Sequence, residues 1–202
     1  MDTLVSDNPE KKDGLNETPK IRKAVLRTIR LEADIDRGLQ MEADKRGGSL
    51  NAYIGMILKK HIEFDVPAEM MNCLSYPHQS FKELIDIVDD EKITKIGQEN
   101  GERLGSVISI WYGKSPTLQS YLNFCSVWGK HSNIFNFSSR LDGRDLNLGF
   151  EHELGMKWSI FLENTMTAAF KDLFEHSCEF KRNDRSLVIR LRLPSHQVDS
   201  LR

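Results

Sequence analysis

No apolar run in the sequence approaches the roughly 20 residues that a membrane-spanning helix needs, so we expect no membrane insertion. The first residues, MDTLVSDNPEKKDG, are polar and lack the apolar centre of a secretion signal, which favours a cytoplasmic location. Cysteine is scarce. Cys73, Cys125 and Cys178 are odd in number and far apart, which fits a reducing compartment better than a disulfide framework.

Signatures of catalysis are also missing. The chain has no G-x-S-x-G, H-E-x-x-H or C-x-x-C motif, and GERLGS at residues 101–106 lacks the spacing of a phosphate-binding loop. In the C-terminal half, His176 lies two residues before Cys178, and His152 lies directly before Glu153. Metal-ligand clusters usually contain pairs such as H-x-H or C-x-x-C, so we expect no metal site and no cofactor, and the missing catalytic motifs lead us to expect no enzyme.

Positive charge is concentrated in one segment although the whole chain has a formal net charge of −2. Residues 20–62 carry ten bases and five acids, whereas residues 1–19 and 63–202 both have an excess of acids. Residues 20–31 alone contain five bases and no acid. Such a patch is the electrostatic footprint of nucleic-acid binding, although a solvated charged surface gives the same pattern.

The basic segment runs into an isolated strand pattern that is followed by two short helical patterns. Residues 24–31 (AVLRTIRL) predict a strand, and residues 34–46 predict a helix that starts at Asp34 and stops at Gly47-Gly48. Ser49 is the natural cap of a second helix of about 13 residues. Because a lone strand cannot satisfy its own backbone hydrogen bonds, it must pair with something.

This pattern, covering residues 24–62, resembles the ribbon-helix-helix family of DNA-binding proteins, the Arc and MetJ repressor type. In that family the strand pairs antiparallel with the same strand of a second subunit, and the two-stranded ribbon enters the major groove of double-stranded DNA. The resemblance implies a homodimer and leaves open whether dimers assemble into tetramers. Ile29 and Leu31 would point into the dimer core, and the opposite face would contact bases through Leu26, Thr28 and Arg30.

The same resemblance implies contacts to the DNA backbone. The free N–H groups at the start of the second helix form an anion site, which in this family holds a DNA phosphate. The residues expected to contact phosphates are Lys20, Arg22, Lys23, Arg27, Ser49, Leu50 and Asn51.

The rest of the chain predicts an α+β fold in which antiparallel hairpins pack on helices. We expect helices over residues 81–90, 91–112, 115–130 and 156–175, and strands over 133–139, 145–152, 177–182 and 186–192. Aromatic residues at helical spacing from Trp111 to Phe170 are typical of a core and, alternatively, of an apolar ligand pocket. The expected division of the chain is a disordered tail (1–19), the ribbon-helix-helix domain (20–63), a linker or hinge (64–80), the α+β domain (81–193) and a flexible C-terminal tail (194–202).

These features favour a dimeric, sequence-specific transcriptional regulator of the repressor type. Its C-terminal half would strengthen oligomerisation or sense a small-molecule effector that the sequence does not identify. Binding of that signal would change the relative position of two ribbons across the hinge. Two alternatives stay open. One is an antitoxin whose C-terminal half binds a toxin, and the other is a ribbon that only dimerises a C-terminal domain with another activity.

Overall fold

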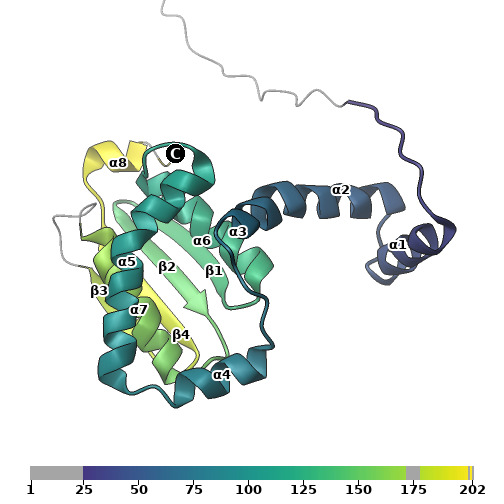
Figure 1. The fold of residues 1–202 in the computed structure, drawn as a ribbon. Coiled ribbons are helices and arrows are strands. Elements are labelled where there is room, and N and C mark those ends of the chain that lie inside the picture. Colours follow the sequence, from purple (N-terminus) through teal and green to yellow (C-terminus); the bar gives the residue numbers. More distant parts are fainter. Residues whose placement is uncertain (1–24, 172–177, 200, 202) are drawn as a thin grey trace, which may run out of the picture.

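The computed structural model describes residues 25–171, 178–199 and 201, and it combines helices with an antiparallel sheet (Figure 1). The sheet has the strand order β1-β2-β4-β3, so its two hairpins join through β2 and β4. The strands are β1 (Asn136–Asp142), β2 (Asp145–Glu151), β3 (Glu179–Arg182) and β4 (Ser186–Arg192). The predicted α+β class with antiparallel hairpins is therefore confirmed.

The first strand begins three residues later than the sequence pattern indicates. Helix α6 (Leu118–Ser132) ends at Asn133, whose φ of +57° is the left-handed conformation that commonly closes a helix. Residues 133–135 therefore lead into the strand instead of belonging to it. At the other end, Gly143 and Arg144 form a two-residue turn, and Gly143 takes a φ of +60° that glycine adopts without strain.

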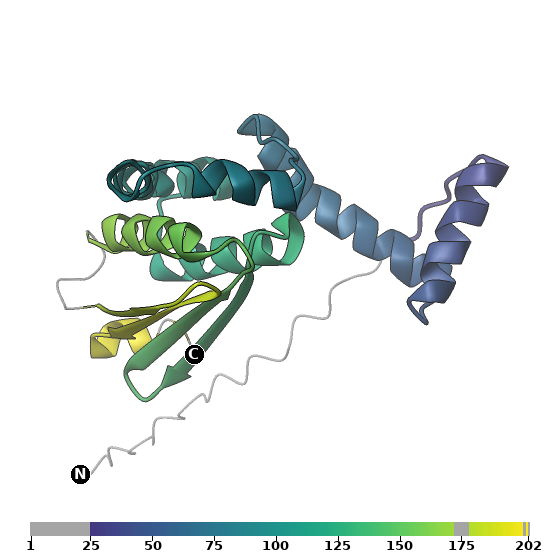
Figure 2. The same ribbon diagram turned by 90° about the horizontal axis from the view of Figure 1, so that it is seen from below.

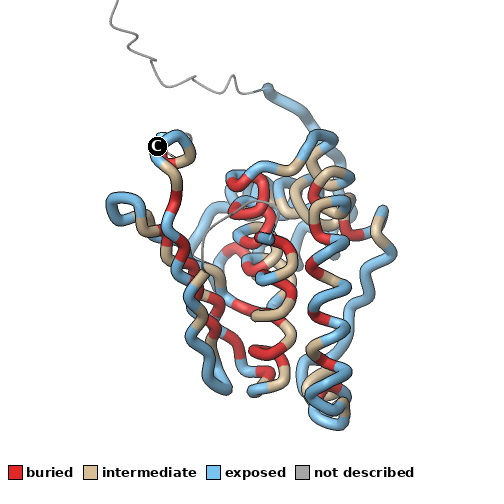
Figure 3. Tube along the Cα trace, turned by 90° about the vertical axis from the view of Figure 1, so that its left-hand side faces the viewer, coloured by how far each residue is buried: buried red, intermediate tan, exposed pale blue. Residues whose placement is uncertain are grey.

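Alternate residues of the two central strands form one wall of the core. Leu146, Leu148 and Phe150 of β2 are at most 2% exposed, and so are the side chains that flank them on β4. The register places Leu148 opposite Ile189. Figure 3 shows the buried residues gathered between the strands and the helices that pack on them. Full burial of one such side chain contributes roughly 1.5–3 kcal/mol.

Helices α6 and α7 (Met156–Phe170) cover this face of the sheet, and α5 (Asp90–Tyr112) stacks on the side of α7 that faces away from the strands (Figure 2). The Thr165 hydroxyl of α7 donates a hydrogen bond of 3.1 Å to the Gly97 carbonyl of α5. The predicted helix over 156–175 and the predicted strand over 177–182 both extend into residues 172–177, which lie outside the described part of the chain.

Two short helices differ from the sequence expectations. Helix α4 (His78–Asp86) begins three residues before the expected start at residue 81. Helix α8 (Ser195–Asp199) occupies the segment for which a flexible tail was expected. Val198 explains the difference because its side chain is only 6% exposed and packs in the main core.

Both ends of the first N-terminal helix and the start of the second lie within one residue of the predicted positions. Helix α1 (Ala33–Lys45) starts after Glu32, so Asp34 lies in its first turn instead of capping it. Gly47 has a φ of +65°, and the Gly48 N–H donates to the Ala43 carbonyl, which closes the helix as predicted. Helix α2 (Leu50–Lys60) is capped by Ser49, whose hydroxyl accepts the Ala52 N–H at 3.2 Å, which confirms that prediction.

The chain stays helical far beyond the expected end of the second helix. A π-helical turn, η1 (His61–Asp65), follows α2 directly and is itself followed by α3 (Val66–Met70). The expected linker over 64–80 is therefore reduced to the non-helical residues 71–77. Pro67 suggested a break in the sequence, but it lies in the first turn of α3, where a missing N–H is tolerated.

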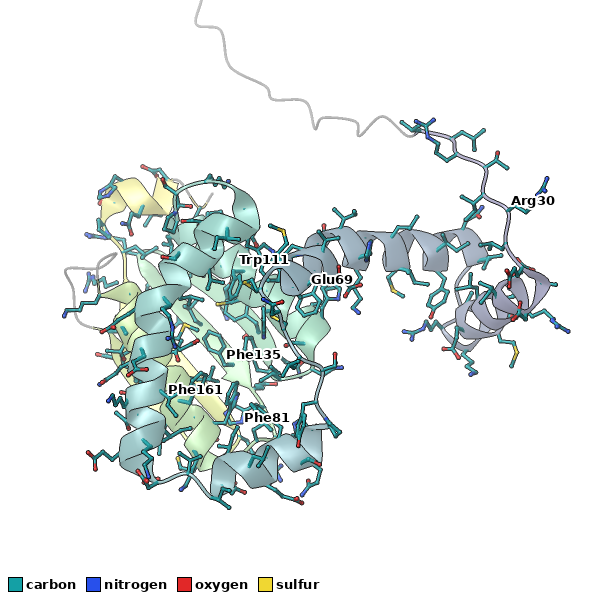
Figure 4. The ribbon with its side chains drawn as sticks, in the orientation of Figure 1. Arg30, Glu69, Phe81, Trp111, Phe135 and Phe161 are labelled. Atoms are coloured by element: carbon teal, nitrogen blue, oxygen red, sulfur yellow. The ribbon has the colours of Figure 1, made fainter. Side chains whose placement is uncertain are left out.

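An aromatic cluster joins this long helix to the α+β domain. The Phe64 ring of η1 lies 5.5 Å from Trp128 of α6, 6.0 Å from Trp111 of α5 and 5.6 Å from His131, measured between ring centroids. Figure 4 shows Trp111 beside the base of the helical arm. The arm, formed by residues 25–63, projects away from the domain from this joint, with α1 at its far end (Figure 1).

A buried polar pair links the end of β2 to α7. His152 follows β2 directly, is 6% exposed, and its Nε2 lies 2.8 Å from the hydroxyl of the fully buried Ser159. The same hydroxyl donates to the Asn183 carbonyl at 2.6 Å. Burial lowers the pKa of His152 to about 4, because the charged form loses its hydration. His152 is therefore neutral at physiological pH.

This pKa shift predicts that acid destabilises the fold through His152. The unfolded chain takes up a proton near pH 6.5, whereas the folded chain takes it up only near pH 4, so stability is lost as the pH falls between these values. Between neutral pH and about pH 4.5, we expect the wild type to lose roughly 2–3 kcal/mol more unfolding free energy than His152→Gln. Urea unfolding at the two pH values measures this difference, and equal losses in both proteins would contradict it.

Candidate nucleic-acid interface

The segment over which a strand was predicted is extended and exposed. Within the described residues, no backbone hydrogen bond joins residues 25–31 to another segment, and no strand is assigned there. Ile29 is 60% exposed and Leu31 is 36% exposed. A row of free backbone donors and acceptors that carries apolar side chains is a ready edge for pairing with another strand.

The side chains predicted to contact bases lie on this free segment. Leu26 is 91% exposed, and Thr28 and Arg30 are also exposed. Arg30 points away from α1 and α2 in Figure 4. Arg27 folds back locally, because its guanidinium donates to the neighbouring Leu26 carbonyl at 3.4 Å. These cations are therefore open to a ligand of opposite charge.

The start of α2 supplies the second part of the predicted interface. The Ser49 hydroxyl accepts a hydrogen bond from the Ala52 N–H. The N–H groups of Leu50 and Asn51 in the first turn have no helical acceptor, as at any helix start. The Ser49 and Asn51 side chains are exposed, while Leu50 is half-buried. This arrangement suits an anion such as a phosphate oxygen. The remaining predicted phosphate contacts, Lys20, Arg22 and Lys23, lie outside the described residues.

The arm leaves most of its large apolar side chains exposed. In the described part of residues 25–62, Ala43 alone is buried. Large apolar side chains exposed on the arm are Val25, Leu26, Ile29, Leu31, Ile35, Met41, Met56, Ile57, Leu58 and Ile62. Many exposed apolar side chains on one segment are typical of an interaction surface in a folded protein.

The structure also bears on the metal site and the membrane-spanning helix that the sequence analysis considered. Within the described residues, no group of three or more His, Cys, Asp or Glu side chains is placed to hold a metal ion, and His176 lies outside them. None of the helices that these residues form has the length and apolar character needed to cross a bilayer.

Sequence reasoning missed Phe64, which connects the arm to the domain. It lies in the segment that was expected to be a linker, and only the continuation of helical spacing beyond Ile62 could have indicated it. It also missed the contact of His152 with Ser159, because no sequence spacing brings these two elements together.

Comparison of the chain with known protein families, with curated proteins and with solved structures gave no match in any of the three searches.

Proposed function

We propose that this chain is a dimeric, sequence-specific DNA-binding transcriptional regulator. Two copies would pair residues 25–31 into an antiparallel ribbon that enters the major groove. The single observation that carries the proposal is the unpaired extended segment 25–31, which presents exposed apolar and cationic side chains ahead of two helices with unburied apolar surface.

A second copy of the chain is the partner that best fits the arm. Pairing residues 25–31 with themselves satisfies the free backbone groups and brings Ile29 and Leu31 of both copies to one face of the ribbon. The exposed apolar side chains of α1 and α2 can then pack against their counterparts. Exposed apolar residues continue along the same helix at Ile62, Val66 and Met70, which extends the surface that a second copy would cover.

Recognition of DNA follows from the opposite face of that ribbon. Arg30 can donate two hydrogen bonds to a guanine edge, and Thr28 can bond to a base or contact a thymine methyl group. The open start of α2 and the basic residues 20–27 would hold phosphates and fix the register of the ribbon.

The joint at Phe64 gives the C-terminal domain a means to influence this ribbon. Because α2, η1 and α3 form one helical run, the packing of Phe64 against Trp111 and Trp128 links the direction of the arm to the domain. The α+β core is folded within a single chain, whereas the toxin-binding segment of an antitoxin commonly folds only on binding. The core therefore supports a regulatory domain more than the antitoxin alternative.

The test is selection from a random-sequence pool of double-stranded DNA, followed by affinity measurements over a range of salt concentrations. We expect the wild type to enrich a two-fold or tandem site, with a slope of log affinity against log salt of roughly −0.9 per neutralised phosphate. The double variant Thr28→Ala/Arg30→Ala should keep most of the slope and lose roughly 1–3 kcal/mol of discrimination per lost bidentate contact.

The control removes the same residue types from the C-terminal domain. Thr94→Ala/Arg103→Ala on α5 should leave both selection and salt slope at wild-type values. If wild-type protein selects no sequence and binds no DNA above background, the ribbon serves only to dimerise, and the proposal is lost.

A further inference from the structure

A polar cavity of about 770 Å³ lies at the end of the sheet where β2 ends and β4 begins. Its wall comes from residues 133–136, 151–153 and 183–186, together with His78 at the start of α4. The volume lies in the range of roughly 300–1,000 Å³ that small-molecule sites occupy. Three separate connections of the fold therefore converge on one space of ligand size.

One residue of the wall, His152, carries a buried acceptor that none of the described residues uses. Ser159 has one hydroxyl proton and donates it to the Asn183 carbonyl, so the close contact with His152 requires that Nε2 carries a proton and donates to Ser159. In the neutral ring, Nδ1 then holds a lone pair. This atom is buried and has no hydrogen-bond partner among the described residues. Unsatisfied buried acceptors are costly and uncommon in folded proteins.

The charge around this acceptor is negative. The cavity wall carries the carboxylates of Glu151, Glu153 and Asp184 and a single guanidinium, that of Arg185. Asp184 acts on His152 electrostatically, since its charge raises the histidine pKa against the larger effect of burial. A ligand that fits this wall must offer a hydrogen-bond donor to His152 and carry positive charge.

We propose that this cavity binds a small molecule with a protonated amine, which donates a hydrogen bond to His152 Nδ1 and is balanced by the surrounding carboxylates. A metal ion suits the wall less well, because no three ligating side chains are grouped within the described residues. The site is separate from the surface to which DNA binding is assigned, and it does not depend on that function.

Calorimetric titration of the full-length protein tests the site with three four-carbon probes at neutral pH and physiological salt. Putrescine carries two terminal amines, butanediol carries hydroxyls in their place, and succinate is a chain of the same carbon number whose two end carbons are carboxylates. We expect saturable binding of putrescine alone. Chemical-shift changes on putrescine addition should fall on residues 133–136, 151–153 and 183–186, and the His152 ring nitrogens should shift.

Two variants that each remove one negative charge distinguish binding in the cavity from a general effect of the protein's acidic surface. Asp184→Asn removes one carboxylate of the wall and should weaken putrescine binding by roughly tenfold or more, as expected for a lost charged partner. Glu91→Gln removes the same charge from the exposed start of α5 and should leave binding unchanged. The proposal is overturned if putrescine does not bind, if butanediol binds equally, if both variants weaken binding alike, or if the shift changes map elsewhere.

Discussion

Ile29→Asp is expected to convert the protein from a dimer to a monomer and to weaken DNA binding by at least about 100-fold. In the proposed ribbon, Ile29 of both copies faces the shared core, and a carboxylate buried there without a partner costs several kcal/mol in each subunit. Because each dimer interface contains two Ile29 side chains, the substitution makes dimerisation less favourable by this cost twice. Sedimentation analysis over a range of protein concentrations measures the dimer, and salt-matched titrations measure the affinity for DNA.

Leu26→Asp is the matched control for this change. It introduces the same charge three residues earlier, on the opposite face of the ribbon, at a side chain that is 91% exposed. We expect this variant to stay dimeric and to lose DNA affinity through repulsion of phosphates. A wild-type chain that sediments as a monomer, or an Ile29→Asp protein that dimerises as tightly as Leu26→Asp, would disprove the ribbon pairing.

Features that depend on local backbone chemistry were predicted well from the sequence. Ser49 was identified as a cap because its hydroxyl can reach the N–H three residues later, and it does so in the structure. Gly47 was identified as a stop because glycine takes a positive φ at little cost. The two hairpins followed from alternation and turn residues in the same way. The ribbon itself stays a prediction, because its partner strand belongs to another molecule.

Features that depend on distant contacts could not be predicted. Pro67 indicates a break when read alone, but the π-helical turn before it lets the chain remain helical through Met70. Phe64 then reaches two tryptophans that lie 47 and 64 residues further along the chain (Trp111 and Trp128). The cavity proposed as an amine site arises in the same way, because residues from three connections meet only after the sheet has formed.

Gly101→Ala is expected to destabilise the α+β domain by about 3 kcal/mol or more, although alanine favours an isolated helix by about 1 kcal/mol over glycine. A Cβ atom at residue 101 would lie 2.2 Å from the Thr165 carbonyl oxygen and 2.7 Å from the Ala168 Cβ on α7. The nearest atom is backbone, so it cannot move without moving the helix. Separating α5 from α7 would also stretch the hydrogen bond from Thr165 to Gly97.

The control is a glycine-to-alanine substitution at a position with free space, for which we expect no loss of stability. Gly38 on α1 is exposed and has no atom within 4 Å of an added Cβ, so Gly38→Ala should leave stability unchanged or raise it by up to about 1 kcal/mol. Urea unfolding monitored by tryptophan fluorescence reports on the domain that contains Trp111, Trp128 and Trp158, and circular dichroism of the same samples also reports on the helices of the arm. If the two alanine substitutions change stability equally, α5 and α7 do not approach each other at Gly101 as closely as the structure shows. A selective loss in Gly101→Ala would establish that the domain is held by backbone contact between the two helices, which no larger residue at position 101 can replace.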